Sequence, residues 1–179
     1  MQNMKLGEYK SLDKESLRDV FLNYLDALDM PIIDYVAFGA QDTIHKTSSS
    51  IMSRLDWQKT FTEMGLASDD PVRKASFNSK ASCFSLDEID YQDNAGREVM
   101  RQRKRHNIEN GIVLVKRSPG HNFMLTLATG YKNFTPYKFF IDYQKSIHRI
   151  FNDLTNLVSP CTKEYQVKIA DHLQDVDAK

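Results

Sequence analysis

The chain has 179 residues, 41% of them hydrophobic and 11% aromatic, which suits one well-packed domain and excludes a disordered chain. Lys plus Arg and Asp plus Glu both total 24, so the formal net charge is zero, whereas domains that grip nucleic acid normally carry a basic excess. The sequence contains no signal-peptide core and no apolar run near the roughly 18 residues of a membrane span, so we expect a soluble, cytoplasmic protein without membrane contact.

The first predicted element is an amphipathic helix over residues 12–28, which ends before Pro31. Hydrophobic residues recur in it at spacings of three and four, as on the buried stripe of a surface helix. These residues are Leu17, Val20, Phe21, Tyr24, Leu25 and Leu28.

A first strand is predicted next, over residues 32–38 and ending at Gly39, because the segment is rich in β-branched and aromatic residues. The polar, Ser-rich stretch 41–50 is interpreted as a loop that leads into a short strand near Ile51. No repeat and no long linker divides the chain.

Two helices are predicted in the middle of the chain, over 56–64 and 94–105, with the Asp70-Pro71 pair as a turn between them. The second helix ends in a basic run. No aromatic residues interleave there to stack on bases, so we interpret the run as a solvated helix face rather than a nucleic-acid patch. Its members are Arg97, Arg101, Arg103, Lys104, Arg105 and His106.

A hairpin and a long helix complete the chain. Strands are expected over 111–116 and 123–129 around a turn at 118–120, and the helix over 136–158. The economical way to bury all these stripes is an α+β fold in which helices flank an antiparallel sheet on both faces. This α-β-α sandwich is the architecture of GAF- and PAS-like sensor domains.

Three residues stand out as candidates for a binding site. Trp57 is the only tryptophan, Asp70 precedes a proline, and Thr126 interrupts an apolar strand. Each has an ordinary structural explanation when taken singly: core packing for the indole, a turn for the aspartate and β-propensity for the threonine.

The spacing of these residues resembles the autoinducer-binding half of LuxR-family quorum-sensing regulators. Trp57 is followed thirteen residues later by Asp70 of an Asp-Pro pair, as in that family. The apolar-Thr-apolar strand 125–128 and the segment 107–111, where the family usually has Gly-Leu-x-x-Gly, add to the similarity. The resemblance extends over residues 17–158.

The resemblance implies an acyl-homoserine lactone or related autoinducer as ligand. Trp57 would donate to the lactone carbonyl, Asp70 would accept the amide N–H, and Thr126 would donate to the acyl carbonyl. Burying those polar groups without partners would cost about 1–3 kcal/mol each, so the site must supply them. The other expected ligand-binding residues are Ala37, Gly39, Ser53, Phe61, Val72, Phe84, Ser85 and Met124.

The aromatic cage of the family is thinned in this chain. Ser53 and Phe61 stand where the family commonly has tyrosine, and the second pocket tryptophan is replaced by a segment in which Phe84 is the nearest bulky residue. Val115 replaces a common strand proline. The polar residues are retained, which suggests a different acyl chain, a non-lactone ligand or relaxed specificity.

Residues 1–160 are expected to form the sensor domain, and residues 161–179 a tail or linker. The family's helix-turn-helix domain needs roughly 60 residues, so we expect DNA contact only through a domain that is absent from this chain. The chain itself is either a truncated fragment or a natural stand-alone sensor. The family also implies a homodimer, or a heterodimer with a related regulator.

No catalytic residue, metal site or cofactor is expected, because the sequence lacks a nucleophile elbow, a phosphate loop and metal-ligand spacing. Two alternatives to a lactone sensor stay open. One is a GAF- or PAS-like sensor of a non-lactone metabolite. The other is a stand-alone interaction module that dimerises with a full-length regulator and modulates it without a ligand.

Overall fold

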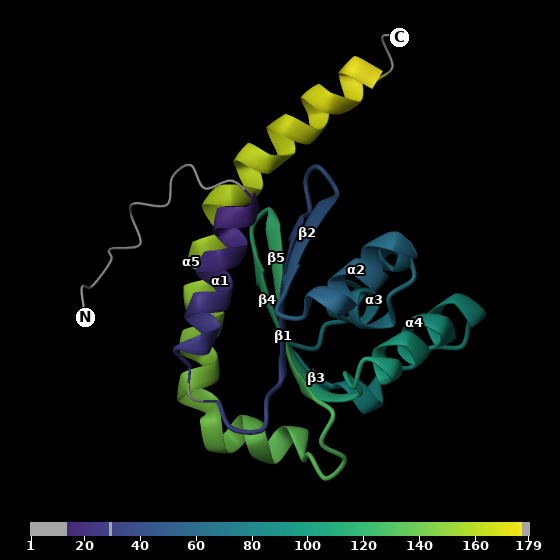
Figure 1. Cartoon of the computed structure of the whole chain (residues 1–179), viewed down its shortest axis with the longest axis vertical. Coiled ribbons are helices and arrows are strands. Elements are labelled where there is room, and N and C mark those ends of the chain that lie inside the picture. Colours follow the sequence, from purple (N-terminus) through teal and green to yellow (C-terminus); the bar gives the residue numbers. More distant parts are fainter. Residues whose placement is uncertain (1–13, 29, 177–179) are drawn as a thin grey trace.

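The chain folds into three layers, with a five-stranded antiparallel sheet between two layers of helices (Figure 1). This computed structural model describes residues 14–28 and 30–176, and the surroundings of the side chains at 17–28 and 30–158. The expected α+β class is therefore confirmed.

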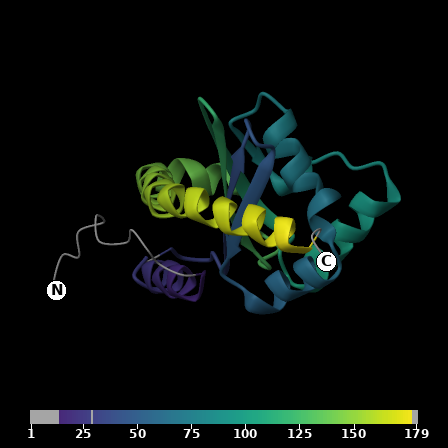
Figure 2. The same cartoon turned by 90° about the horizontal axis from the view of Figure 1, so that it is seen from above.

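The two faces of the sheet carry different helices. In both views α1 and α5 cover one face, while α2, α3 and α4 cover the other (Figures 1 and 2). The helix bounds are α1 Lys14–Asp26, α2 Leu55–Glu63, α3 Pro71–Asn78, α4 Asn94–Arg105 and α5 Pro136–Val176.

The strands are arranged in the order β2-β1-β5-β4-β3, and each neighbouring pair is antiparallel. The three central strands are buried on both faces, which explains why their sequences are almost continuously apolar. The strand bounds are β1 Tyr35–Asp42, β2 Thr47–Met52, β3 Cys83–Ser85, β4 Asn110–Ser118 and β5 His121–Thr129.

The N-terminal strands differ from the prediction. β1 begins at Tyr35 instead of residue 32, because Ile32 lies in a turn with φ 76° and is 54% exposed. The stretch 41–50, expected to be a loop, belongs largely to β1 and β2, whose pairing extends to Asp42 opposite Thr47. β2 is an edge strand with mostly exposed side chains, so its serines reach solvent and no apolar alternation marks the strand in the sequence.

The predicted turn at Asp70-Pro71 is the start of a helix. Asp70 has an extended backbone and caps α3, and Pro71 occupies the first turn, where its missing N–H costs nothing. The sequence indicates a turn at this pair, but an Asp-Pro pair also favours the N-terminus of a helix. The short strand β3, which pairs with β4, is a second element that the sequence did not reveal.

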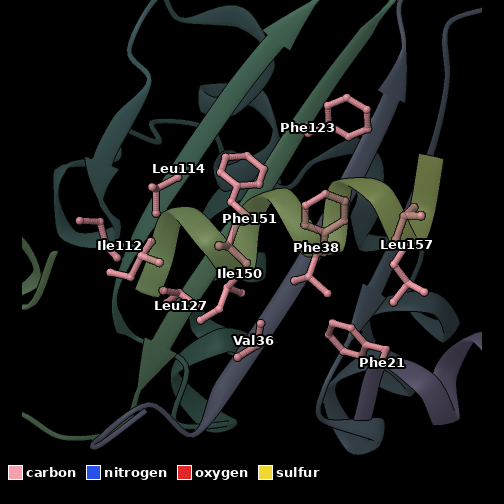
Figure 3. Packing of buried hydrophobic residues seen from close by; sticks show 14 of the residues in the cluster. Phe21, Val36, Phe38, Ile112, Leu114, Phe123, Leu127, Ile150, Phe151 and Leu157 are labelled. Atoms are coloured by element: carbon pink, nitrogen blue, oxygen red, sulfur yellow. The ribbon is translucent and has the colours of Figure 1, made fainter. Parts of the chain in front are cut away.

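The core between the sheet and α5 is made of large apolar side chains, which interlock as Figure 3 shows. Phe38 of β1 packs edge-on against Phe151 of α5, with ring centroids 5.8 Å apart. Helix α5 is interrupted by a kink at Tyr143, and it continues past the predicted end at residue 158. The expected tail 161–179 thus continues α5 as far as Val176, and 177–179 lie outside the described residues.

Two isoleucines of α5 test whether this core dominates stability. Ile147 is fully buried, so Ile147→Ala should lower the free energy of unfolding by about 2–5 kcal/mol. Ile141 is 71% exposed, so Ile141→Ala should change it by less than about 0.5 kcal/mol. Urea denaturation of both variants provides the measurement, and equal effects would contradict the described packing.

Candidate functional site

One row of paired residues crosses the sheet on the face that α2, α3 and α4 cover. Thr126 of β5 lies opposite Ala37 of β1 on one side and Val113 of β4 on the other. The row continues to Met52 at one edge and Phe84 at the other. Thr126 is therefore a buried hydroxyl in the middle of an apolar row.

Helix α2 places Trp57 over this face. The indole is fully buried, and Phe61 follows one helical turn later with its ring in an edge contact, 5.5 Å between centroids. The His106 ring lies 5.3 Å from the indole on another side. Trp57 is thus held in one orientation by its own helix and by the end of α4.

Asp70 is buried at the start of α3 and accepts two hydrogen bonds. Its Oδ1 accepts the backbone N–H of Val72 at 3.1 Å, which caps the helix. Its Oδ2 accepts from Nη2 of Arg103 at 2.9 Å. Asp70 and Arg103 are only 2% and 3% exposed, so they form a buried ion pair between α3 and α4.

The interpretation of the basic run as a solvated helix face is wrong for Arg103. Gln102 beside it is buried as well, whereas Arg101, Lys104 and Arg105 are exposed as expected. The sequence contained a weak signal that one side of α4 is buried. Its buried positions recur at intervals of three and four residues: Gly96, Val99, Gln102 and Arg103. The basic character of the run concealed that stripe.

The Arg103 guanidinium lies 5.3 Å from the centroid of the Trp57 ring system, within the range of a cation–π contact. Burial opposes the charge, but Asp70 and Tyr35 outweigh it, so the pKa of Arg103 lies above its ordinary value. Burial raises the pKa of Tyr35 to about 12, with Arg103 opposing the rise and Asp70 adding to it. At neutral pH Arg103 is therefore a cation and Tyr35 a neutral phenol.

Three buried N–H groups of this site have no hydrogen-bond acceptor among the described residues: Nε1 of Trp57, and Nε and Nη1 of Arg103. The Tyr35 hydroxyl faces both Trp57 and Arg103 and interacts with each side chain, but none of the three N–H groups meets it with full hydrogen-bond geometry. Buried donors are almost always paired in folded proteins, so three incompletely satisfied donors in one cluster make it the candidate ligand-binding site.

Several predicted residues surround this cluster on the same side of the sheet. Val72 is fully buried on α3, and Ser76 one turn later donates to the sulfur of Met124 at 2.9 Å. Gly39 faces the same methionine, because a Cβ on Gly39 would lie 3.2 Å from Cε of Met124. With Ala37, Phe61 and Phe84, these residues form the apolar part of the site, which we call the α2–α4 layer site.

Two predicted residues lie elsewhere. The Ser53 hydroxyl accepts the backbone N–H of Val36 at 2.9 Å and lines a cavity of about 260 Å³ beside α1 and α5, on the opposite face. Ser85 lies opposite Ile112, whose side chain belongs to the α5 core, and its backbone N–H donates to Glu88 in a capping box. The structure does not bring either serine to Trp57.

Among the residues that the structure describes, no cluster of His, Cys, Asp and Glu could hold a metal ion. Within the same residues, no helix is long and apolar enough to cross a membrane.

Comparisons with known proteins bear on the whole fold. The family model described as the autoinducer binding domain matches residues 13–148. A crystal structure of Escherichia coli SdiA superposes with a TM-score of 0.54 at 10% identity, covering 87% of this chain and 63% of that one, so this chain spans less than two thirds of that protein. The solution structure of E. coli SdiA1-171 gives a TM-score of 0.52 at 12% identity, covering 86% of this chain and 88% of that one. These identities show a shared fold alone, and no curated protein matches in sequence.

Removing the Arg103 side-chain charge tests the buried ion pair. Arg103→Met leaves the Asp70 carboxylate buried without its partner, so the free energy of unfolding should fall by about 3–5 kcal/mol. Arg105→Met, the same change on an exposed position of α4, is the control and should alter it by less than about 0.5 kcal/mol. Urea unfolding measures both variants, and a tolerated Arg103→Met would contradict the pair's burial.

Proposed function

We propose, because the chain belongs to the autoinducer-binding domain family, that it binds a small-molecule autoinducer in the α2–α4 layer site. The observation that carries this placement is the cluster of buried, unpaired N–H groups on Trp57 and Arg103 beside Asp70. A ligand with carbonyl oxygens would satisfy these donors, and its acyl chain would lie against the apolar side chains around them.

The roles expected from the family fit the positions of two of the three residues, Trp57 and Thr126. The Trp57 indole N–H faces the Tyr35 hydroxyl without full hydrogen-bond geometry, so a ligand carbonyl would be its acceptor, and the Thr126 hydroxyl lies on the same face of the sheet. Asp70 differs from the expectation, because it already accepts from Arg103 and from Val72. We propose an acyl-homoserine lactone or a related acyl compound as the ligand class.

Ligand binding would act on this domain through stability. Helices α2 and α3 have nine and eight residues, too short to be stable in isolation, so their positions depend on side-chain packing against the sheet. A ligand that fills space and satisfies donors beneath them would favour the ordered layer. This is linkage, in which any molecule that binds the folded state alone stabilises it.

The proposed receptor passes its signal to another domain or protein, such as a second copy or a related regulator. The chain's formal net charge is zero, so it lacks the basic excess that is typical of domains that bind nucleic acid. The free, half-buried Cys83 thiol suits a reducing compartment, and we propose a cytoplasmic location. We propose a binding role for the domain, because the buried Asp70 and Arg103 pair with each other beside donors that suit a ligand's oxygens.

An interaction module that needs no ligand is the less favoured function. Such a domain gains nothing from buried donors that lack acceptors, because each unpaired group costs about 1–3 kcal/mol. If the interior served packing alone, we would expect each buried N–H group to have an acceptor or to be replaced by an apolar group.

Thermal unfolding of the full chain with N-acyl-homoserine lactones carrying butanoyl, octanoyl or dodecanoyl chains tests the proposal. A lactone at about a hundred times its dissociation constant should add about 2.7 kcal/mol and raise the melting temperature by several degrees. Trp57→Phe keeps the ring packing but removes the N–H, so it should weaken binding about tenfold.

The control is Phe21→Leu, a change at a fully buried position on the α1 and α5 face. It should lower the melting temperature of the free protein and leave the increment caused by the ligand unchanged. If both variants reduce the increment equally, the ligand does not bind at Trp57.

A further inference from the structure

Arg103 changes what the α2–α4 layer site can recognise, a point that rests on the proposed function. Its guanidinium donates through Nη2 to Asp70, while Nε and Nη1 have no acceptor with full hydrogen-bond geometry, although the Tyr35 hydroxyl faces the guanidinium. These two nitrogens lie at different corners of a planar group, so each needs its own acceptor. With Nε1 of Trp57, the site has unpaired donors in at least three directions.

Asp70, in contrast, already has a protein partner on each of its oxygens, although each oxygen keeps a second lone pair. Each of its oxygens already accepts one hydrogen bond, from Val72 at 3.1 Å and from Arg103 at 2.9 Å. Its charge is balanced by Arg103 at the same short distance. A ligand N–H would therefore gain much less from this carboxylate than from an unpaired one, since the strong hydrogen bonds are those to an uncompensated charge.

The charge balance of the site also limits the ligand. Arg103 and Asp70 are both almost fully buried and cancel each other's charge, and the nearby Tyr35 is neutral. A carboxylate added to this site would leave one net buried negative charge, which is strongly unfavourable. A neutral carbonyl or ester oxygen accepts the free N–H groups without that penalty.

We infer that Arg103 is the specificity-determining residue of this site and selects a neutral acyl compound whose head group offers oxygen acceptors and needs no N–H. In this arrangement Arg103 takes the place of the ligand amide as the partner of Asp70. The free donors of Arg103 and Trp57 then bind the ligand's oxygens.

A pair of probes that differ in one atom tests this inference on the full chain. The first is N-octanoyl-homoserine lactone, and the second is its ester analogue, 2-octanoyloxy-γ-butyrolactone, in which oxygen replaces the N–H. Calorimetric titration should show that the ester binds as tightly as the amide or more tightly. The ring-opened N-octanoyl homoserine, which carries a carboxylate, should bind about tenfold or more weakly than the amide. Butanoyl and dodecanoyl versions of each probe cover the unknown chain length.

The outcomes separate the two proposals. If replacing the N–H by oxygen weakens binding about tenfold or more, Asp70 accepts the ligand amide, and the inference about Arg103 is overturned while the proposed function stands. If no probe of any chain length binds, the proposed function fails and the inference fails with it. Tighter binding of the ring-opened carboxylate than of both lactones also overturns the inference.

Variants give a second, independent readout. Arg103→Met frees Asp70, so the preference should reverse toward the amide probe. Because that variant is expected to be unstable, the double variant Asp70→Asn with Arg103→Met removes both charges together and avoids an unpaired buried carboxylate. It should bind the ester probe about tenfold more weakly than the parent chain. Unchanged ester affinity in the double variant would show that Arg103 does not contact the ligand. The matched control is Arg105→Met, a change on the exposed face of α4.

Discussion

The antiparallel pairing of β1, β5 and β4 determines which side chains meet which layer of helices. Because side chains alternate along a strand, a slip of one residue would exchange the two faces completely. In the observed register, Phe38 and Leu125 lie opposite each other and face α5, while Ala37 and Thr126 lie opposite each other and face α2 to α4. The face toward α5 is filled by the sheet's own large residues. The other face carries small residues such as Ala37 and Thr126 among larger ones such as Tyr35 and Met124, and side chains from the helices, including Trp57, pack over it.

The ion pair between Asp70 and Arg103 lies in that space and joins α3 to α4. A buried ion pair is weak evidence for stability, because removing two charges from water costs about as much as their attraction returns. The pair in this protein also leaves two guanidinium nitrogens and the neighbouring Trp57 indole without acceptors. Packing alone does not account for such an arrangement, whereas the proposed ligand would supply the oxygen acceptors.

Elements that depend on local pattern could be predicted from the sequence. The helices α1, α2, α4 and α5 and the hairpin of β4 and β5 are marked by periodicity, by Gly120 in the turn and by their lengths. The edge strands could not be predicted, because β2 is exposed and β3 has three residues, so neither shows an alternating pattern. Helix α3 was missed because the Asp-Pro pair that caps it also occurs in turns. The predicted end of α5 at residue 158 was too early, because the helix continues through Pro160, a residue type that normally ends or kinks a helix.

The sequence by itself determined the α+β class, the spacing of Trp57 from Asp70 and the place of Thr126 in an apolar strand, because helix and strand periods and short motifs are local properties. Only the tertiary structure decided which groups meet. Arg103 is 33 residues from Asp70 in the chain, and its partner is set by how α3 and α4 cross the sheet. The same packing leaves Ser53 on the opposite face, although it lies only four residues from Trp57. Contacts between distant segments depend on strand register and helix packing, and no short window of sequence contains them.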